Sequence, residues 1–256
     1  VRVTMYIGID LGTSGVKTIL TDESGKVVDT ASSSLTVAIP QPLWSEQNPE
    51  DWWTATCATL DELKQRNDLS VVKALGLAGQ MHGATLLDKA GQVLRPAILW
   101  NDGRSGDQCR TLESTVAKAR VITGNLVMPG FTAPKLLWVK ENEPDIFKQV
   151  DKILLPKDYL RYKLTGEFAS DMSDSAGTSW LNTGERSWSK SMLMACGLSE
   201  KHMPTLYEGN EITGYLTAKT AKRWGMKAVP VVAGAGDNAA GAVGCGIVDA
   251  GQAMLS

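Results

Sequence analysis

Short apolar runs, each ended by turn residues, open the chain. Residues 5–10 (MYIGID) and 16–22 (VKTILTD) are rich in apolar and β-branched side chains, and the turn-forming stretch LGTSG joins them. Residues 25–37 (GKVVDTASSSLTV) follow a second turn at ESGK. Runs of this length between turn residues are typical of β-strands. The pattern therefore predicts a three-stranded meander.

The next segment changes from strand-like runs to helical spacing. Residues 47–66 (QNPEDWWTATCATLDELKQR) place Asn48 at an N-cap position and Pro49 at the first helical position, with acids in the first turn. Apolar side chains at Trp52, Leu60 and Leu63 recur at helical spacing. These are the signals that begin and sustain an amphipathic helix.

The rest of the chain alternates between apolar runs and helical patterns. We expect strands at 71–79, 84–88, 93–100 and 228–234, helices at 106–118, 134–143 and 217–224, and the opening of another strand at 251–256 (GQAMLS). Strands that alternate with helices in this way predict an α/β layered domain.

Composition and charge exclude several classes of partner. The formal net charge of the 256 residues is −2, and Lys and Arg are dispersed, so a phosphate-backbone footprint for nucleic acid is missing. Nowhere do about 18 apolar residues follow one another, so the sequence predicts no membrane span. The cysteines form no C-x-x-C motif, which favours free thiols in the cytoplasm over disulfides or zinc. They are Cys57, Cys109, Cys196 and Cys245.

The turn between the first two predicted strands could bind phosphate. Gly12, Thr13, Ser14 and Gly15 can present backbone N–H groups and two hydroxyls toward one point. Lys17 could add a positive charge, and Asp10 could hold Mg²⁺ directly or through water. An ordinary hairpin explains the same residues. A Walker P-loop is excluded because G-x-x-x-x-G-K-[ST] does not occur.

A second stretch, residues 231–244 (VVAGAGDNAAGAVG), surrounds Asp237 with very small residues. Three interpretations are open. Asp237 could cap a helix that starts at Asn238. Residues 234–239 also fit the dinucleotide pattern G-x-G-x-x-A, although Asp237 would then set a negative charge beside a pyrophosphate. Alternatively, Asp237 is a general base, and the small neighbours leave room for a substrate and a phosphoryl group.

Seven segments together give the sequence a specific resemblance. They are GIDLGTSGVK, LWSEQNPEDWW, LGLAGQMHGATLLD, RPAILWNDGR, TGNLVMPGFTAPKLLW, LLPKDYLRYKLTGEFASDMSDSAGT and GAGDNAAGAVG. From about Met5 to Ser256 the chain resembles the N-terminal half of the FGGY carbohydrate kinase family. That resemblance implies a ribonuclease-H-like fold of the actin, hexokinase and Hsp70 superfamily, with a mixed β-sheet flanked by helices.

The resemblance also implies a domain arrangement. Residues 5–250 would form the N-terminal domain, which binds sugar and carries the catalytic base. Residues 251–256 would begin a second, nucleotide-binding domain. Family members are about twice as long as this chain, and their second half carries the adenosine pocket and a second phosphate loop. We therefore expect the 256 residues alone to be inactive.

The reaction implied by the resemblance is phosphoryl transfer from ATP, with Mg²⁺, to a sugar or polyol hydroxyl. The implied sugar is D-xylulose, phosphorylated on its 5-hydroxyl, with Asp237 as the base that accepts the proton and Asp10 orienting Mg²⁺ and the phosphates. Matches to the first phosphate loop are Gly12, Thr13, Ser14 and Lys17. Matches to sugar-contacting positions are Met81, His82, Trp100 and Asn238.

The physical chemistry of these sugar positions is suitable. His82 offers a donor and an acceptor to neighbouring hydroxyls, Met81 an adaptable apolar wall, and Trp100 an aromatic floor. A structural histidine and a core tryptophan explain the same residues without a ligand. Another ketose or polyol as substrate, a non-catalytic actin-like sugar-binding module and a nicotinamide enzyme remain alternatives. The oligomeric state is open, with a homodimer among the states that the sequence allows.

Overall fold

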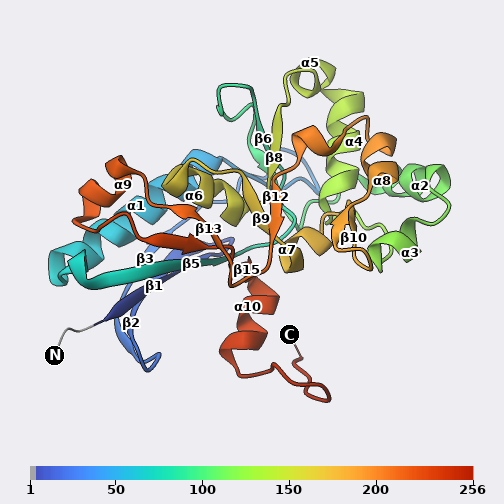
Figure 1. The fold of residues 1–256 in the computed structure, drawn as a ribbon. Coiled ribbons are helices and arrows are strands. Elements are labelled where there is room, and N and C mark those ends of the chain that lie inside the picture. The colour runs from blue at the N-terminus through green and yellow to red at the C-terminus, as the bar shows by residue number, and fades with distance from the viewer. Residues whose placement is uncertain (1–3, 256) are drawn as a thin grey trace.

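A seven-stranded mixed sheet forms one end of the molecule (Figure 1). The structure is a computed structural model that describes residues 4–255, so Ser256 of the predicted second-domain segment lies outside the described residues. The strands run in the order β13-β14-β5-β1-β2-β3, and β15 also pairs with β5. Their bounds are β1 Met5–Leu11, β2 Gly15–Asp22, β3 Val27–Ser34, β5 Val72–Gly79, β13 Ile212–Tyr215, β14 Pro230–Val232 and β15 Ala235–Gly236.

The predicted N-terminal meander is confirmed. Strands β1, β2 and β3 pair antiparallel in sequence order. Strand β5 pairs parallel with β1 on the other side, as the crossover through helix α1, Pro49–Arg66, requires. Alternate residues of β1, Ile7, Ile9 and Leu11, are buried, which is the period expected of a strand with one covered face.

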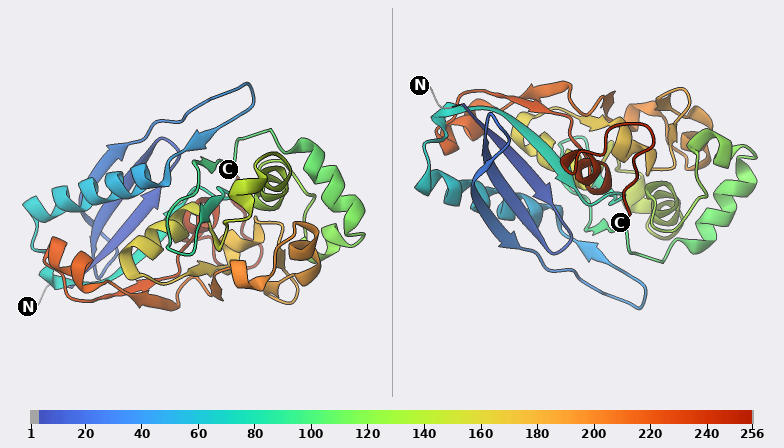
Figure 2. Two further views of the ribbon diagram at one scale, coloured as in Figure 1. Left: turned by 90° about the horizontal axis from the view of Figure 1, so that it is seen from above. Right: turned by 90° about the horizontal axis from the view of Figure 1, so that it is seen from below.

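Helix α1 begins where the sequence predicts. The side chain of Asn48 accepts a hydrogen bond from the N–H of Glu50 at 3.1 Å, and Pro49 occupies the first turn. Trp52, Leu60 and Leu63 are fully buried. Viewed from above, α1 lies across the strands, whereas the strands are in view from below (Figure 2).

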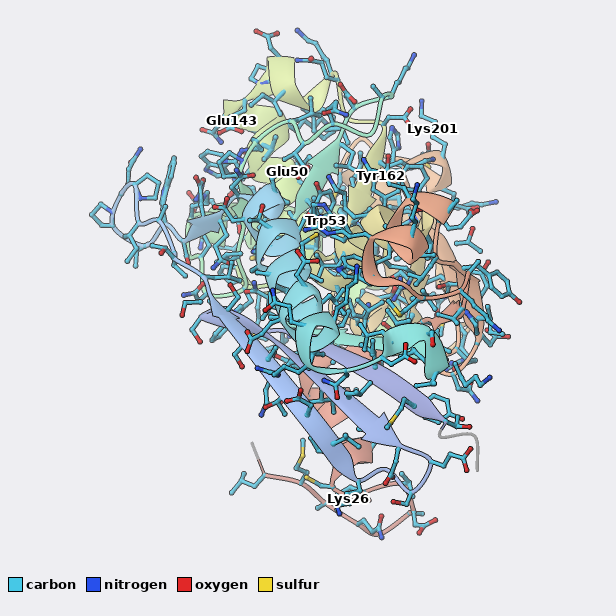
Figure 3. The ribbon with its side chains drawn as sticks, turned by 90° about the vertical axis from the view of Figure 1, so that its left-hand side faces the viewer. Lys26, Glu50, Trp53, Glu143, Tyr162 and Lys201 are labelled. Carbon is cyan, nitrogen blue, oxygen red and sulfur yellow. The ribbon has the colours of Figure 1, made fainter. Side chains whose placement is uncertain are left out.

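Helices α6, Pro156–Thr165, and α9, Ala218–Trp224, complete the core on the same side as α1. Figure 3 shows Glu50 and Trp53 on α1 beside Tyr162 of α6. Lys163 joins the two helices through an ion pair with Glu50 at 2.8 Å. One hydrophobic core therefore lies between the sheet and these three helices.

A mostly helical region with a separate core forms the other end of the molecule (Figure 1). Its helices are α2 Gly106–Thr115, α3 Ala119–Thr123, α4 Thr132–Asn142, α5 Pro144–Phe147, α7 Met172–Ala176 and α8 Lys190–Ala195. Four two-stranded sheets accompany them: β4 Glu46–Gln47 with β7 Ala97–Ile98, β6 Thr85–Leu87 with β8 Lys152–Leu154, β9 Ala169–Asp171 with β12 Thr205–Tyr207, and β10 Leu181–Asn182 with β11 Ser187–Trp188. Single 3₁₀ turns occur at Leu69–Val71 and Glu200–His202.

Three sequence expectations need correction here. The strand predicted at 84–88 forms as β6, outside the main sheet, but the strand predicted at 93–100 is shortened to two residues because Pro96 has no N–H to donate. The helix predicted over 106–118 ends at Thr115, and extended backbone at Val116 separates it from α3. No strand forms over 251–255: Gly251 has a φ of +89°, Gln252 bonds back to the turn at Val248 and Asp249, and Leu255 is fully exposed.

The α/β class is confirmed by this architecture. Within the described residues, no helix combines the length and apolar character needed to cross a bilayer.

Candidate active site

Strand β5 sets the positions of the two candidate acids. Asp10 on β1 and Ala235 on β15 both lie opposite Ala78 of β5, and Leu11 and Gly236 both lie opposite Gly79. The three strands are parallel, so β1 and β15 end at the same edge. Two interstrand spacings put the backbones of Asp10 and Ala235 about 10 Å apart. The sequence separates these acids widely, and the sheet brings them to one place.

A left-handed glycine directs the chain from β14 into β15. Gly234 has a φ of +74°, and a Cβ there would lie 1.8 Å from the carbonyl oxygen of Leu77. Only glycine fits this close approach in this conformation. The chain therefore leaves its pairing with Leu75 at Val231 and pairs again at Ala235, which places Asp237 at the end of the sheet.

Asp237 is the first residue of helix α10, Asp237–Gly244, and Gly236 is the N-cap. The interpretation of Asp237 as the helix cap is therefore wrong, because the helix begins at Asp237 itself and not at Asn238. The Asp237 carboxylate accepts a hydrogen bond from the N–H of Asn238 at 2.7 Å, and both side chains are exposed. None of the residues of α10 is buried, and the helix projects from the body (Figure 1).

Asp10 experiences the charge of Asp237. Its side chain is accessible to solvent, yet surrounding protein atoms desolvate it and raise its pKa above the ordinary value of 3.8. The Asp237 carboxylate raises the pKa further, and Lys17, which lies opposite Asp10 on β2, lowers it. Two carboxylates that repel each other across an open edge form a place where a cation would be stabilised.

The predicted phosphate turn is a tight hairpin between β1 and β2. The N–H of Gly12 donates to the carbonyl of Gly15 at 2.9 Å, and Ser14 is exposed. The hydroxyl of Thr13 donates to Gln80 and accepts from Trp100, both at 3.0 Å. The hydroxyl proton of Thr13 and the N–H of Gly12 are thus already in use, and the exposed Ser14 is the residue of the turn that a phosphate could reach most easily.

Met81 and His82 follow β5, and Met81 lies beside Gly236, the residue before Asp237. A Cβ on Gly236 would come within 2.8 Å of the Met81 side chain, so Met81 packs directly against the residue before Asp237. The His82 ring meets Phe131 edge-on with ring centroids 4.7 Å apart. His82 also approaches Gly177 closely, since a Cβ there would lie 2.1 Å from Nε2.

The backbone and charge state of His82 are both unusual. Its φ is +67°, a conformation that costs energy for a non-glycine residue and that often marks functional sites. Burial and, to a smaller extent, the charge of the nearby Lys135 lower the pKa of His82 to about 4. The ring is therefore neutral at pH 7, with one nitrogen able to donate and the other able to accept.

Trp100 is 49% exposed and lies beside the hairpin, to which its indole N–H is bonded. Gly130 allows a further close approach, because a Cβ there would lie 2.7 Å from the carbonyl oxygen of Trp100. An aromatic ring that is held on one side and open on the other can receive the C–H face of a sugar.

Sequence reasoning missed three residues that support this arrangement. Gln47 and Gln80 are buried amides bonded to the hairpin, and Lys135 is a buried lysine whose ammonium donates to the carbonyl of His82 at 2.9 Å. Gln80 stands beside Met81 in the GQMHG segment, so its neighbourhood was a signal. No sequence signal marked Lys135, since a lysine in a helical pattern is normally exposed.

The residues that could meet a metal are few. Within residues 4–255, no group of three or more His, Cys, Asp or Glu side chains is arranged to hold a metal ion. A single accessible carboxylate such as Asp10 fits Mg²⁺, which keeps several waters and shares the oxygens of its substrate.

Comparison with known proteins decides the family. The model of the FGGY family of carbohydrate kinases, N-terminal domain, matches residues 5–244. The chain belongs to the FGGY family. It is 66% identical to the xylulose kinase of Escherichia coli (strain K12) over 252 residues, which cover 98% of this chain and 52% of that protein. This chain thus spans about half the length of the curated relatives that it matches.

Solved structures agree with the family. The crystal structure of a xyloylose kinase from Brucella ovis is similar with a TM-score of 0.93 and 54% identity over 96% of this chain and 51% of that one. The crystal structure of the xylulose kinase from Rhodospirillum rubrum is similar with a TM-score of 0.92 and 30% identity. The match covers 96% of this chain and 52% of that one. These FGGY neighbours confirm the predicted ribonuclease-H-like fold, a mixed sheet flanked by helices.

Proposed function

We propose that the protein to which this chain belongs transfers a phosphoryl group from ATP to the 5-hydroxyl of D-xylulose. The observation that carries the proposal is the register of β5, which brings Asp10 and Asp237 to one edge of the sheet. The similarity to xylulose kinases supports the choice of sugar.

The proposed roles follow from position. Asp237, exposed at the start of α10, accepts the proton as the sugar oxygen bonds to the γ-phosphorus and the bond from phosphorus to ADP breaks. General bases contribute about 10²–10⁴-fold to such reactions. Met81, neutral His82, Trp100 and Asn238 are proposed to hold the sugar.

Asp10 is the residue proposed to hold Mg²⁺, which neutralises charge on the phosphates when bound. Lys17, exposed and opposite Asp10, adds positive charge, and the turn of Gly12, Thr13 and Ser14 is proposed to lie against the phosphates. The boundary that we propose between this domain, residues 5–250, and a nucleotide-binding domain starting at 251–256 implies that this chain alone has no kinase activity.

The test uses the full-length protein with Asp237→Asn. We expect kcat for D-xylulose to fall by at least about 10²-fold, because the amide cannot accept the proton. ADP release by a coupled assay gives kcat, and thermal unfolding checks that the fold is kept. Near-normal kcat would remove Asp237 from the chemistry.

A panel of ketoses and polyols in the same assay checks the substrate. A kcat/KM for another sugar above that for D-xylulose would replace the substrate and keep the enzyme class. Sugar binding without ADP release in the wild-type protein would instead support a sugar-binding module.

A further inference from the structure

A continuous chain of hydrogen bonds connects the buried Trp52 with the exposed Trp100. The Trp52 indole donates to Gln47 Oε1 at 2.9 Å, and Gln80 Nε2 donates to the same oxygen at 3.0 Å. The Thr13 hydroxyl donates to Gln80 Oε1 at 3.0 Å. Trp100 then donates to that hydroxyl at 3.0 Å.

The two indoles fix the direction of every bond in this chain. An indole N–H can only donate, so the Gln47 atom that faces Trp52 is its oxygen. The Gln80 atom that meets this oxygen must then be its NH₂ group, and its own oxygen is left to face Thr13. The hydroxyl of Thr13 consequently donates to Gln80, which leaves its lone pairs for Trp100.

The middle of the chain is buried, so the bonds are costly to break. Gln47 is 3% exposed and Gln80 1%. Gln47 Nε2 also donates to the carbonyl of Thr13 at 2.7 Å, which holds the hairpin backbone as well as its side chain. A buried polar group that loses its partner carries its full desolvation penalty.

We propose that Gln80 is a positioning residue that couples the hairpin at Thr13 to the orientation of Trp100. The proposal rests on the proposed function in one respect, that Trp100 lies under the sugar. Displacement of the hairpin moves Thr13, and the single fixed pattern of donors requires Trp100 to follow. Gln80 acts on this coupling by accepting a hydrogen bond from the Thr13 hydroxyl, which turns the lone pairs of that hydroxyl toward the Trp100 indole.

The test is a double-mutant cycle in the full-length protein with Gln80→Met and Trp100→Phe. Methionine keeps the length of the side chain and removes both polar groups. We expect Gln80→Met to raise the KM for D-xylulose about tenfold and to change kcat less than about threefold. In the Trp100→Phe background, which has no indole N–H to hold, the same change raises KM less than about twofold. Additive effects in the cycle would overturn the coupling.

Substitutions at Thr13 examine the same chain from its other side. Thr13→Ser keeps the hydroxyl and should therefore raise the KM for D-xylulose less than Thr13→Val, which should raise it about as much as Gln80→Met. Equal effects of serine and valine would contradict the proposal. Gln108→Met is the matched control, because Gln108 is a buried amide that bonds to Glu141 at 2.6 Å in the helical region.

A second readout does not need turnover. Acrylamide quenching of Trp100, taken as the difference between each protein and its Trp100→Phe partner, should increase in Gln80→Met and in Thr13→Val but not in Gln108→Met. Unchanged quenching would overturn the coupling even if the enzyme is active. If quenching increases in these variants but the wild-type protein phosphorylates no sugar, the coupling between Thr13 and Trp100 is supported and the proposed function is wrong.

Discussion

Two lysines are fully buried under the two sides of the candidate site, and their surroundings act on them in opposite directions. Lys157, on α6, meets three carboxylates: those of Asp158 at 2.7 Å, Asp171 at 2.6 Å and Asp174 at 3.0 Å. Lys135, on α4, meets two backbone carbonyls, those of His82 at 2.9 Å and Gly130 at 2.7 Å.

The pKa values follow from these partners. Burial lowers the pKa of both lysines, but the three carboxylates outweigh it at Lys157 and raise the pKa of that residue above its ordinary value. At Lys135 burial lowers the pKa to about 7, with Asp102 opposing and Arg104 adding to the shift. Burial alone therefore does not determine the state of a lysine; the charge of its neighbours does.

The two lysines also support different parts of the site. Asp174, one of the three carboxylates, lies against Gly236, since a Cβ there would be 3.4 Å from its Oδ1. The cluster around Lys157 thus lies next to Gly236, the residue before Asp237. Lys135 instead holds the strained peptide of His82. Changes at each lysine should affect the protein through a different mechanism.

The largest expected effect is that of Lys157→Met. Removing this ammonium leaves three buried carboxylates with Arg161 as their remaining close cation, so we expect a loss of about 3–5 kcal/mol in the free energy of unfolding. Urea denaturation of the full-length protein measures it. Lys163→Met, which breaks the partly exposed pair with Glu50, is the control and should cost less than about 1 kcal/mol. Equal losses would show that the buried cluster is not special.

Lys135→Met should cost less, about 1–3 kcal/mol, because it leaves carbonyls and not charges without a partner. The loss should depend on pH. The folded protein holds this proton less tightly than the unfolded chain, whose lysine has a pKa near 10.5, so the wild type gains stability as pH rises from about 7 to 10. Lys135→Met lacks this gain, and the difference between the two proteins should widen over that range. Lys64→Met, at an exposed lysine that donates to a distant carbonyl, should show no such trend.

Asp174→Asn should change the free energy of unfolding least of the three substitutions. The pH dependence of that change should be opposite to that of Lys135→Met. Burial is the largest cause that raises the pKa of Asp174 to about 7, against an ordinary value of 3.8, although Lys157 lowers it. The folded protein thus holds this proton more tightly, and the wild type loses stability as pH rises from about 4 to 7. Asp174→Asn should become steadily more stable relative to the wild type over that range. A constant difference in denaturation midpoints would contradict the assignment.

Local signals in the sequence predicted several of the elements that surround the site. The helix-start signals at Asn48 and Pro49 and the apolar, β-branched runs within residues 5–22 each act over a few positions, and the helix and strands predicted there were confirmed. The candidate site residues came from motif resemblance, and their roles stay predictions.

Contacts between distant segments could not be predicted. The bond from Trp100 to Thr13 spans 87 positions, and that from Thr13 to Gln80 spans 67, so no local pattern records them. The two buried lysines had ordinary helical surroundings in the sequence, KLLW and KDYL. Likewise, the runs at 84–88 and 93–100 have strand character, but only tertiary structure decides which sheet they join.

The shared register of β1 and β15 on β5 has a mechanical consequence. Backbone hydrogen bonds to one shared strand, β5, fix the separation between Asp10 and Gly236, the residue before Asp237. Twisting or bending of a sheet spreads over many strands, and the share that falls on two neighbouring spacings is small. We therefore expect the distance between the backbones of Asp10 and Gly236 to change little when a substrate binds, so that the substrate adjusts its position to the two acids.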